Sequence, residues 1–316
     1  MTRKSLSSTP RVTLAMPVYN GQNFLHKSIE SILTQSFMDF ELIVSDNASS
    51  DSTCEIVESY QRMDSRIRLV KHPRNIGAAA NYNFGFQQAK GEYLKWCAHD
   101  DEIDRTLLQH LVSKLDGNQD LALAFGKTVC IDEEGREIPT VGVEMPEILD
   151  DDPVVRFIKA IAQLGTCFPI FGLFRKNVLA KTTLHRPYYS SDKALLAEVA
   201  LLGRLGFVPA AIFFNREHKQ RSINLAKSER SAWQNGTKSR YAAAEHLNLL
   251  RHYFEIAWRH QNVAPPLRLT LAVIRYGIEP MQLCRYITEC AGLVSPSAER
   301  IIKRSAGRLL GRREYS

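Results

Sequence analysis

The chain has 316 residues, of which 44% are hydrophobic and 24% charged, and its formal net charge is +7. These values are ordinary for a globular protein with a sizeable core, and no run approaches the roughly 20 apolar residues that a membrane span requires. Six Lys or Arg against a single Glu follow residue 299, so the excess charge predicts a role for the tail and argues against nucleic acid as a partner.

The six cysteines, at 54, 97, 130, 167, 284 and 290, follow no regular spacing and form no CxxC motif. We therefore expect reduced thiols in a cytoplasmic protein rather than a disulfide framework or a zinc site. Residues 1–10 are polar and lack the apolar core of a signal peptide, so we expect a flexible N-terminus.

Strands and helices are expected to alternate over the first hundred residues. Apolar runs predict strands at 11–18, 40–45, 67–70 and 93–97, and the segments between them predict helices near 24–33, 53–60 and 78–89. This alternation is typical of an α/β fold with a mostly parallel sheet flanked by helices.

The remaining elements are expected in a different order. Strands are predicted at 121–129 and 206–214, helices at 154–164 and 194–202, and an aromatic strand or wall at 168–174. The Pro- and Asp-rich segment 139–153 predicts a mobile loop over the site. From 225 to 316 the pattern is purely helical, so we expect an α-helical C-terminal extension.

Polar side chains follow three of the predicted strands: Tyr19 and Asn20, then Asp46, then Asp100 and Asp101. Because the carboxyl ends of parallel strands meet at one edge of a sheet, these residues are expected to lie together. Paired carboxylates suit Mg²⁺ or Mn²⁺, whereas Asp101 could instead cap the following helix. Neither GxGxxG nor a P-loop is present.

Five short motifs together resemble the inverting family 2 nucleotide-sugar glycosyltransferases with the GT-A fold. They are Pro17-Val-Tyr-Asn20, Asp46-Asn-Ala-Ser-Ser-Asp51, Asn75-Ile-Gly77, Gly91-Glu-Tyr93 and Ala98-His-Asp-Asp101. The resemblance covers residues 11 to about 222. It implies a GT-A catalytic domain at 11–224, with a nucleotide-binding half (11–101) and an acceptor half (102–224), followed by the extension at 225–316.

The resemblance also implies roles for individual residues. Pro17, Tyr19 and Asn20 would line the nucleotide pocket, Asp46 would accept a hydrogen bond from the uracil imide, and Arg74 or Asn75 would flank the base or ribose. Asp100 would bind the metal. The family commonly has an aspartate where this chain has Ala98, so His99 or Asp101 would supply the missing contact.

In the acceptor half, Asp192 precedes a helix at the position where the family places its catalytic base, although an N-cap alone would explain it. Similarity to a late Arg-x-His motif makes His218 a further metal ligand. Arg216 or Arg221 would then bind the diphosphate.

These roles predict a metal-dependent transfer of a sugar, with UDP-sugar as the favoured donor, to a hydroxyl of a glycan or lipid-linked glycan in surface polysaccharide synthesis. The alternatives are a nucleotidyltransferase on a similar fold and a non-catalytic nucleotide-sugar binding protein. The basic tail predicts peripheral contact with the inner face of the membrane, and a homodimer contact is the other reading of the helical extension.

Overall fold

The computed structural model describes residues 9–140, 145–163, 167–236, 244–295 and 297–303. Its strands are β1 (Val12–Val18), β2 (Phe40–Asp46), β3 (Ile67–Lys71), β4 (Tyr93–Trp96), β5 (Glu102–Ile103), β6 (Leu121–Ile131), β7 (Glu137–Ile138), β8 (Leu173–Arg175) and β9 (Arg204–Arg216). Its α-helices are α1 (Leu25–Leu33), α2 (Thr53–Met63), α3 (Ala78–Gln88), α4 (Leu107–Asp116), α5 (Pro153–Gln163), α6 (Lys176–Leu179), α7 (Ser191–Leu202), α8 (Lys227–Asn235), α9 (Glu245–Arg259), α10 (Pro266–Gly277) and α11 (Pro280–Val294). Two 3-10 helices span Phe168–Phe171 and Ser222–Asn224.

The strands of the described part form one sheet in the order β3-β2-β1-β4-β8-β6-β9-β5, with β7 attached to β6. Neighbours are parallel from β3 to β4, whereas β8 runs antiparallel to both β4 and β6. On the far side β9 is parallel to β6, and β5 is antiparallel to β9. The predicted α/β class is confirmed; the sheet is parallel in its first half and mixed in its second.

The register of the central strands places the polar strand ends side by side. All seven residues of β1 are buried, as expected of a strand covered on both faces. Val18 lies opposite Asp46 in the parallel pair of β1 and β2, so the segments that follow both strands leave the sheet at the same edge. This edge carries the candidate site.

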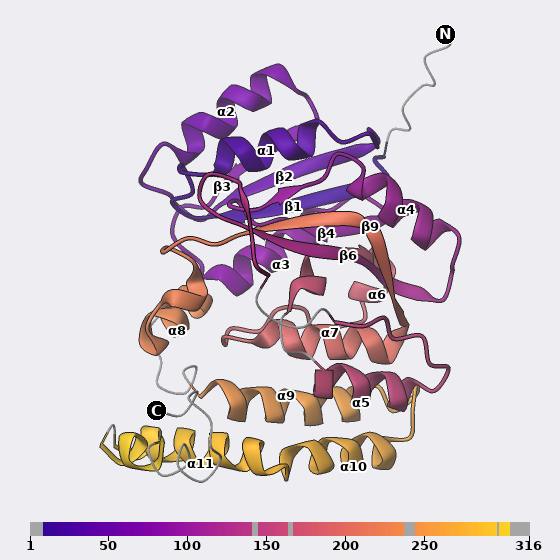
Figure 1. The fold of residues 1–316 in the computed structure, drawn as a ribbon, viewed down its shortest axis with the longest axis vertical. Helices are drawn as coiled ribbons and strands as arrows, with labels where there is room; N and C mark the ends of the chain where they lie inside the picture. The colour runs from indigo at the N-terminus through magenta and orange to yellow at the C-terminus, as the bar shows by residue number, and fades with distance from the viewer. Residues whose placement is uncertain (1–8, 141–144, 164–166, 237–243, 296, 304–316) are drawn as a thin grey trace.

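Helices cover both faces of the sheet (Figure 1). On one face α1, α2 and α4 pack over a core that includes Leu14, Ile29 and Leu108. On the other face α3 and α7 lie next to the sheet, α5 and α9 lie beyond α7, and α10 and α11 form the outermost layer. The core of this second face joins Leu196 of α7 to Ile256 of α9, so the predicted helical extension packs directly on the sheet-bearing part of the chain.

The prediction of a mobile loop over the site at 139–153 is wrong for the residues that the structure describes. Positions 141–144 lie outside the described residues, but Met145 and Ile148 are buried. The backbone of Ile148 exchanges hydrogen bonds of 2.8 and 2.9 Å with Leu205, at the start of β9. Asn215 and Arg216 stand at the other end of β9, so this segment is fastened away from the site.

Several predictions concern the chain ends and the cysteines. The flexible N-terminus predicted at 1–10 and the basic tail beyond residue 303 lie almost wholly outside the described residues and stay predictions. All six cysteines are free thiols. Among the helices that the structure describes, none combines the length and the apolar character needed to cross a bilayer.

Candidate active site

The loops that follow β1 and β2 are joined by hydrogen bonds between side chains and backbone. The backbone N–H of Asn20 donates to Ser49 Oγ at 2.8 Å, and the N–H of Ser50 donates to Asn20 Oδ1 at 2.9 Å. The N–H of Gly21 donates to Thr53 Oγ1 at 2.9 Å. These bonds satisfy backbone donors that would otherwise be free in a loop, and they hold the two strand ends together.

The loop after β3 joins the same cluster through Asn47. The Asn47 side chain donates to Asn75 Oδ1 at 2.9 Å and accepts a hydrogen bond of 2.8 Å from the backbone of Ile76. The loops after the neighbouring strands β1, β2 and β3 therefore form one structural unit, which we call the interlocked loops. The topology brings together the predicted residues Asn20, Asp46 and Asn75.

Asp46 lies at the base of this unit and is 2% exposed. Its Oδ2 accepts a hydrogen bond of 3.1 Å from the backbone of Ser49, while its Oδ1 is buried and has no hydrogen-bond partner. An unpaired buried carboxylate oxygen costs free energy unless a ligand donates to it. This oxygen is therefore a ready acceptor for an N–H group of a bound base.

Residues with positive φ angles occur around the candidate site. Among the described non-glycine residues, four have positive φ: Asn20 (51°), Ala48 (62°), Leu184 (55°) and Ser190 (70°). Asn20 and Ala48 belong to the interlocked loops, and Ser190 directly precedes the helix that carries Asp192. Such conformations persist where surrounding contacts enforce them, and they concentrate at functional sites.

The other predicted nucleotide-side residues occupy different depths. Pro17 is buried within β1, whereas Tyr19 is 43% exposed and Arg74 is exposed at the rim. His99 packs against Gly21, where a Cβ atom would lie 2.6 Å from the His99 ring, so only glycine allows this approach. His99 therefore lies next to the interlocked loops. From this position it could make the contact that an aspartate in place of Ala98 makes in the family.

Asp100 and His218, the two predicted metal ligands, are in direct contact. His218 Nε2 lies 2.8 Å from Asp100 Oδ2, and the side chains are 6% and 16% exposed. Burial acts to raise the pKa of Asp100, but the His99 charge and the His218 hydrogen bond outweigh it and lower that pKa to about 2. Asp100 therefore stays ionised near neutral pH, as a metal ligand must.

The distance between these two atoms suits neighbouring ligands of one ion. Two ligands at about 2.1 Å from an octahedral ion, set at a right angle, lie about 3 Å apart. The described residues contain no group of three His, Cys, Asp or Glu side chains that could hold a metal. A divalent ion here would have two protein ligands and take the others from water or phosphate oxygens.

Asp101 turns into the protein. It is 6% exposed, and its Oδ1 accepts hydrogen bonds from the backbone of Arg216 at 2.8 Å and from Asn215 Nδ2 at 3.2 Å. Burial and the neighbouring Asp100 charge raise its pKa well above the ordinary value. The carboxyl group of Asp101 fastens the end of β9 to the segment after β4, and its role at the nucleotide stays a prediction.

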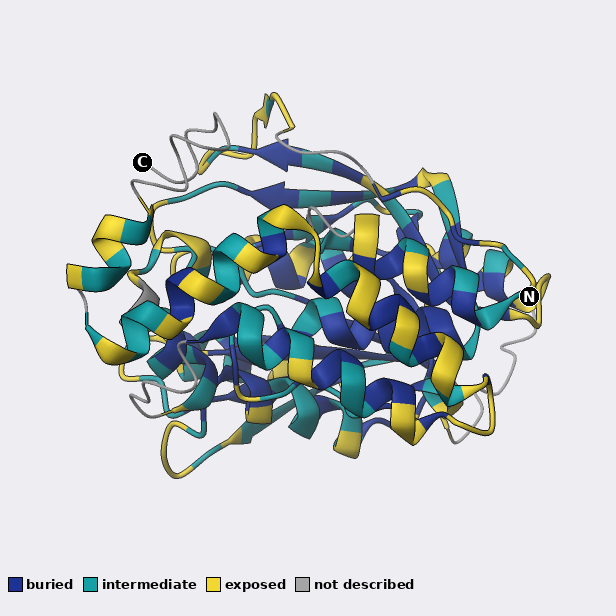
Figure 2. Cartoon of the chain, turned by 90° about the horizontal axis from the view of Figure 1, so that it is seen from below, coloured by how far each residue is buried: buried dark blue, intermediate teal, exposed yellow. Residues whose placement is uncertain are grey.

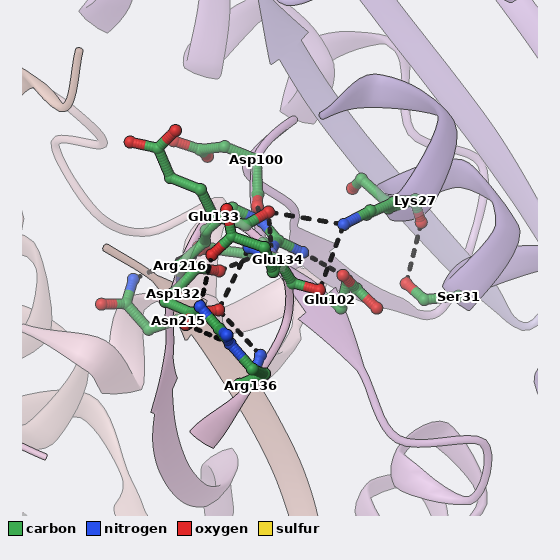
Figure 3. A network of polar contacts seen from close by, with 12 residues as sticks. Lys27, Ser31, Asp100, Glu102, Asp132, Glu133, Glu134, Arg136, Asn215 and Arg216 are labelled. Atoms are coloured by element: carbon green, nitrogen blue, oxygen red, sulfur yellow. Dashed lines mark hydrogen bonds and ion pairs between the residues drawn. The ribbon is translucent and has the colours of Figure 1, made fainter. Parts of the chain in front are cut away.

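Arg216, for which a role at the diphosphate stays a prediction, is held by contacts within the protein. Its side chain is 0% exposed. Its guanidinium donates to the backbone oxygens of Asp100 (2.9 Å), Asp132 (2.8 Å) and Glu133 (3.1 Å), and it pairs with the carboxylate of Glu102. Figure 3 shows this guanidinium among the 100–102 and 132–134 segments, which take four of its five N–H donors.

Arg221 is the other candidate for the diphosphate. It pairs with Glu217, its side chain is 18% exposed, and its charge acts to lower the pKa of Asp101. A guanidinium this close to the Asp100–Asp101 pair, and only partly covered, can exchange its exposed partner for a phosphate oxygen.

Asp192 stands in the first turn of α7, behind the left-handed residue Ser190. Burial raises its pKa above the ordinary value, against the opposing effects of Lys193 and a hydrogen bond with the thiol of Cys167. A carboxylate with a raised pKa is a better proton acceptor than an ordinary one.

The side chain of Tyr82, on α3, links Asp192 to the metal-ligand side. Burial raises the pKa of Tyr82, and the next contributions come from the charges of Asp100, Asp101 and Asp192 in turn. The charges of these three carboxylates therefore act on one buried phenol. The convergence of Asp100, Asp192 and His218 on one region stays a prediction.

Three residues of this region were not found from the sequence: Tyr82, Asn47 and Cys167. Tyr82 belongs to an alanine- and asparagine-rich helix whose polar and apolar positions do not separate into faces, so no pattern marked it. Asn47 stands within the polar loop after β2, where its position next to Asp46 was the available signal. Nothing in the spacing of Cys167 indicated a contact with Asp192.

Comparison with known proteins gives a family match. The model described as Glycosyl transferase family 2 matches residues 13–182, more than half of the chain. A Campylobacter jejuni protein named GalNAc(5)-diNAcBac-PP-undecaprenol beta-1,3-glucosyltransferase is 29% identical over 224 residues, covering 70% of this chain and 69% of that protein. An uncharacterised glycosyltransferase of Haemophilus influenzae is 34% identical over 132 residues, which are 42% of this chain and 52% of that one.

Solved structures share the fold at low sequence identity. S. aureus TarS 1-349 in complex with UDP superposes with a TM-score of 0.61 at 16% identity, covering 92% of this chain and 83% of that one. The mannosyltransferase PcManGT from Pyrobaculum calidifontis, in complex with GDP-Man and Mn²⁺, gives a TM-score of 0.54 at 18% identity, covering 98% and 83%. These similarities include the sheet and the helical C-terminal region.

Proposed function

The chain belongs to glycosyl transferase family 2, and from this premise we propose that it moves a sugar from a UDP-sugar to a hydroxyl of a glycan or lipid-linked glycan, with inversion and with the help of a divalent metal. The observation that carries the proposal is the contact of Asp100 with His218 beside the interlocked loops, where Asp46 Oδ1 is buried without a partner. This arrangement would supply a metal site and a nucleotide site, and Asp192 at the start of α7 would supply the base.

The nucleotide end of the donor fits the interlocked loops. Asp46 offers a buried, unpaired Oδ1 to the imide N–H of uracil, and a charge-assisted hydrogen bond there would satisfy both groups. Tyr19, Arg74 and Asn75 lie at the exposed rim, where they can contact the base and ribose. The guanine ring also carries an N–H donor, so the test below compares UDP-sugars with GDP-Man.

Asp100 and His218 would hold the metal, Mn²⁺ or Mg²⁺. Bound there, the ion would offset the negative charge that the nucleoside diphosphate gains as the glycosidic bond breaks. Arg221 would add a second positive charge on the same oxygens. Arg216 and Asp101 keep Asp100 and His218 in place, because they tie the segment after β4 to the end of β9.

Asp192 would act as the base. It accepts the proton of the acceptor hydroxyl while that oxygen bonds to the anomeric carbon and the bond from this carbon to the diphosphate oxygen breaks. One displacement inverts the anomeric centre, so no second carboxylate nucleophile is needed. The raised pKa of Asp192 matches this role.

The acceptor class follows from the name of a relative. The C. jejuni relative is named for transfer onto a glycan joined to PP-undecaprenol, and we extend that class, a lipid-linked glycan of surface polysaccharide synthesis, to this chain.

The test is release of nucleoside diphosphate from UDP-sugars and GDP-Man, with and without Mn²⁺, together with calorimetric titration of each donor. We expect metal-dependent release from a UDP-sugar, and at least about tenfold weaker donor binding for Asp100→Ala. The matched control is Asp120→Ala, because the Asp120 side chain is 77% exposed and pairs with Arg204 at the start of β9. Release of pyrophosphate from a nucleoside triphosphate incubated with a sugar phosphate would instead indicate a nucleotidyltransferase, and binding without turnover in any condition would indicate a binding protein.

A further inference from the structure

The outermost helix layer carries an apolar stripe that faces away from the protein. On α10, Leu267, Leu271, Ile274 and Ile278, just past its end, are 69%, 55%, 43% and 61% exposed. Their spacing of four, three and four residues places them on one side of the helix. Leu269 and Val273 are 0% exposed on the opposite side, so α10 is apolar on two faces and buries only one.

The next helix repeats the stripe sixteen residues later. On α11, Leu283, Ile287, Cys290 and Val294 have the same spacing and are all exposed, with Val294 reaching 83%. Figure 1 shows α10 and α11 following one another along the outer edge, and both pack on α9 with their inner sides. Figure 2, which looks at the molecule from this side, shows exposed positions recurring along these helices. We call the seven aliphatic side chains of the two stripes the outer face: Leu267, Leu271, Ile274, Ile278, Leu283, Ile287 and Val294.

Basic residues flank the outer face. Arg268 and Arg275 are exposed next to the stripe of α10, and that helix contains no Asp or Glu, although Arg268 pairs with Asp152 at 2.6 Å. On α11 the carboxylate of Glu289 is 4% exposed and bonded to His246, which leaves Glu279, between the helices, as the exposed acid of this stretch. The chain beyond residue 303 adds four arginines against one glutamate.

We propose that the outer face docks on an anionic lipid surface. A helix that lies in the membrane interface has this composition: aliphatic side chains that enter the boundary between headgroups and acyl chains, and arginines that reach lipid phosphates from the flank. α10 and α11 together span roughly 40 Å at 1.5 Å per residue, which gives a long, narrow stripe suited to a plane. The inference does not depend on the transferase reaction.

A second copy of this chain is the less suitable occupant. Pairing two outer faces would bring Arg268 and Arg275 of each copy towards those of the other, with Asp152, which pairs with Arg268, and Glu279 as the acids to offset them. Anionic headgroups provide the opposite charge directly.

The experiment is sedimentation of the full chain with vesicles of phosphatidylcholine alone or mixed with phosphatidylglycerol. We expect binding to the anionic vesicles, weaker binding at high salt, and at least tenfold weaker partitioning for the double variant Leu271→Glu/Ile287→Glu. Arg268→Gln/Arg275→Gln should weaken binding to anionic vesicles at least threefold. The matched control is Met63→Glu on α2, where the side chain is 73% exposed on the opposite side of the sheet, and its binding should stay within twofold of the wild type.

Because every substituted position is exposed, thermal unfolding of each variant should match that of the parent chain. Undiminished vesicle binding by Leu271→Glu/Ile287→Glu would overturn the proposal. A second result would also overturn it: the wild-type chain does not bind vesicles, and light scattering shows a dimer that becomes a monomer in this double variant. The outer face would then join two copies of the chain. Equal effects of Met63→Glu and the outer-face variant would mean that added negative charge, rather than the stripe, governs binding.

Discussion

The loops at the nucleotide side of the candidate site bond to their immediate neighbours in the sheet, whereas the segment that delivers Asp192 is held by a helix more than fifty residues further along the chain. Asn20, Asn47 and Ser49 form hydrogen bonds among loops that leave adjacent strands at one edge. All of these residues lie within the segment that matches the family model, residues 13–182.

The Asp192 side lies beyond that segment and has a buried polar network. Glu198, six residues after Asp192 on α7, is 0% exposed; its Oε2 accepts hydrogen bonds from Thr183 N (2.8 Å) and Oγ1 (2.7 Å), and its Oε1 lies 2.7 Å from His260 Nε2. His252 of α9 lies 2.7 Å from Thr183 Oγ1 and 2.8 Å from the Tyr188 hydroxyl. The C-terminal helices thus hold the segment 183–190, which positions Asp192.

The difference separates two tasks. Donor recognition rests on contacts that the order of strands produces by itself, while the position of the base depends on packing with the helical extension. Changes on the nucleotide side should therefore alter donor affinity, and changes on the Asp192 side should alter turnover or stability with donor affinity kept.

The largest expected effect is that of Asp192→Asn. An amide cannot accept the proton of the acceptor hydroxyl, so the transfer rate should fall about 10³-fold, within the range of general-base contributions. Donor affinity, measured by calorimetry, should remain within twofold because the nucleotide side is separate. The wild-type rate should fall as the pH is lowered through the raised pKa of Asp192, because only the ionised carboxylate accepts the proton. Near-normal turnover by Asp192→Asn would show that another group is the base.

Much of the nucleotide side could be predicted from the sequence. Asp46, Asn20 and Asp100 were found because each follows an apolar run, and parallel strands bring such positions to one edge. The contact of Asp100 with His218 followed from the family resemblance, although the sequence separates them by 118 residues.

The same signal does not show in which direction a side chain points. Asp101 and Arg216 are also polar residues at strand ends, but they point inward and bond to each other's segments, which spacing along the chain does not reveal. The backbone pairing of Ile148 with Leu205 was not predicted for a related reason. The two residues are 57 positions apart, and a backbone pair of this kind requires no particular residue type.

Arg216→Met tests whether Arg216 is structural. Removing a fully buried guanidinium leaves Glu102 and three backbone oxygens without their donor, so we expect a loss of about 3–5 kcal/mol in the free energy of unfolding. The matched control is Arg204→Met at the other end of β9, where the side chain is 32% exposed and its ion pairs should contribute about 1 kcal/mol or less. If Arg216 instead bound the diphosphate, Arg216→Met would leave urea unfolding unchanged and weaken donor binding.

The smallest expected effect concerns His252 and the pH dependence of stability. The Thr183 hydroxyl donates to Glu198, so His252 Nε2–H donates to Thr183, and Nδ1 accepts from Tyr188. Both nitrogens are thereby used in the neutral ring, and burial lowers the pKa of His252 from 6.5 to about 4.

The unfolded chain therefore binds a proton at higher pH than the folded protein does. Stability should fall as the pH drops from 6.5 to about 4, by up to about 3 kcal/mol from this residue, and should level off below that range. Urea unfolding at successive pH values should show a shallower fall for His252→Gln, whereas Tyr188→Phe at pH 8 should lose about 1 kcal/mol by leaving Nδ1 without its donor. An identical pH profile for the wild type and His252→Gln would mean that this histidine is free to take a proton in the folded state, and that α9 does not hold the Asp192 segment in the manner described.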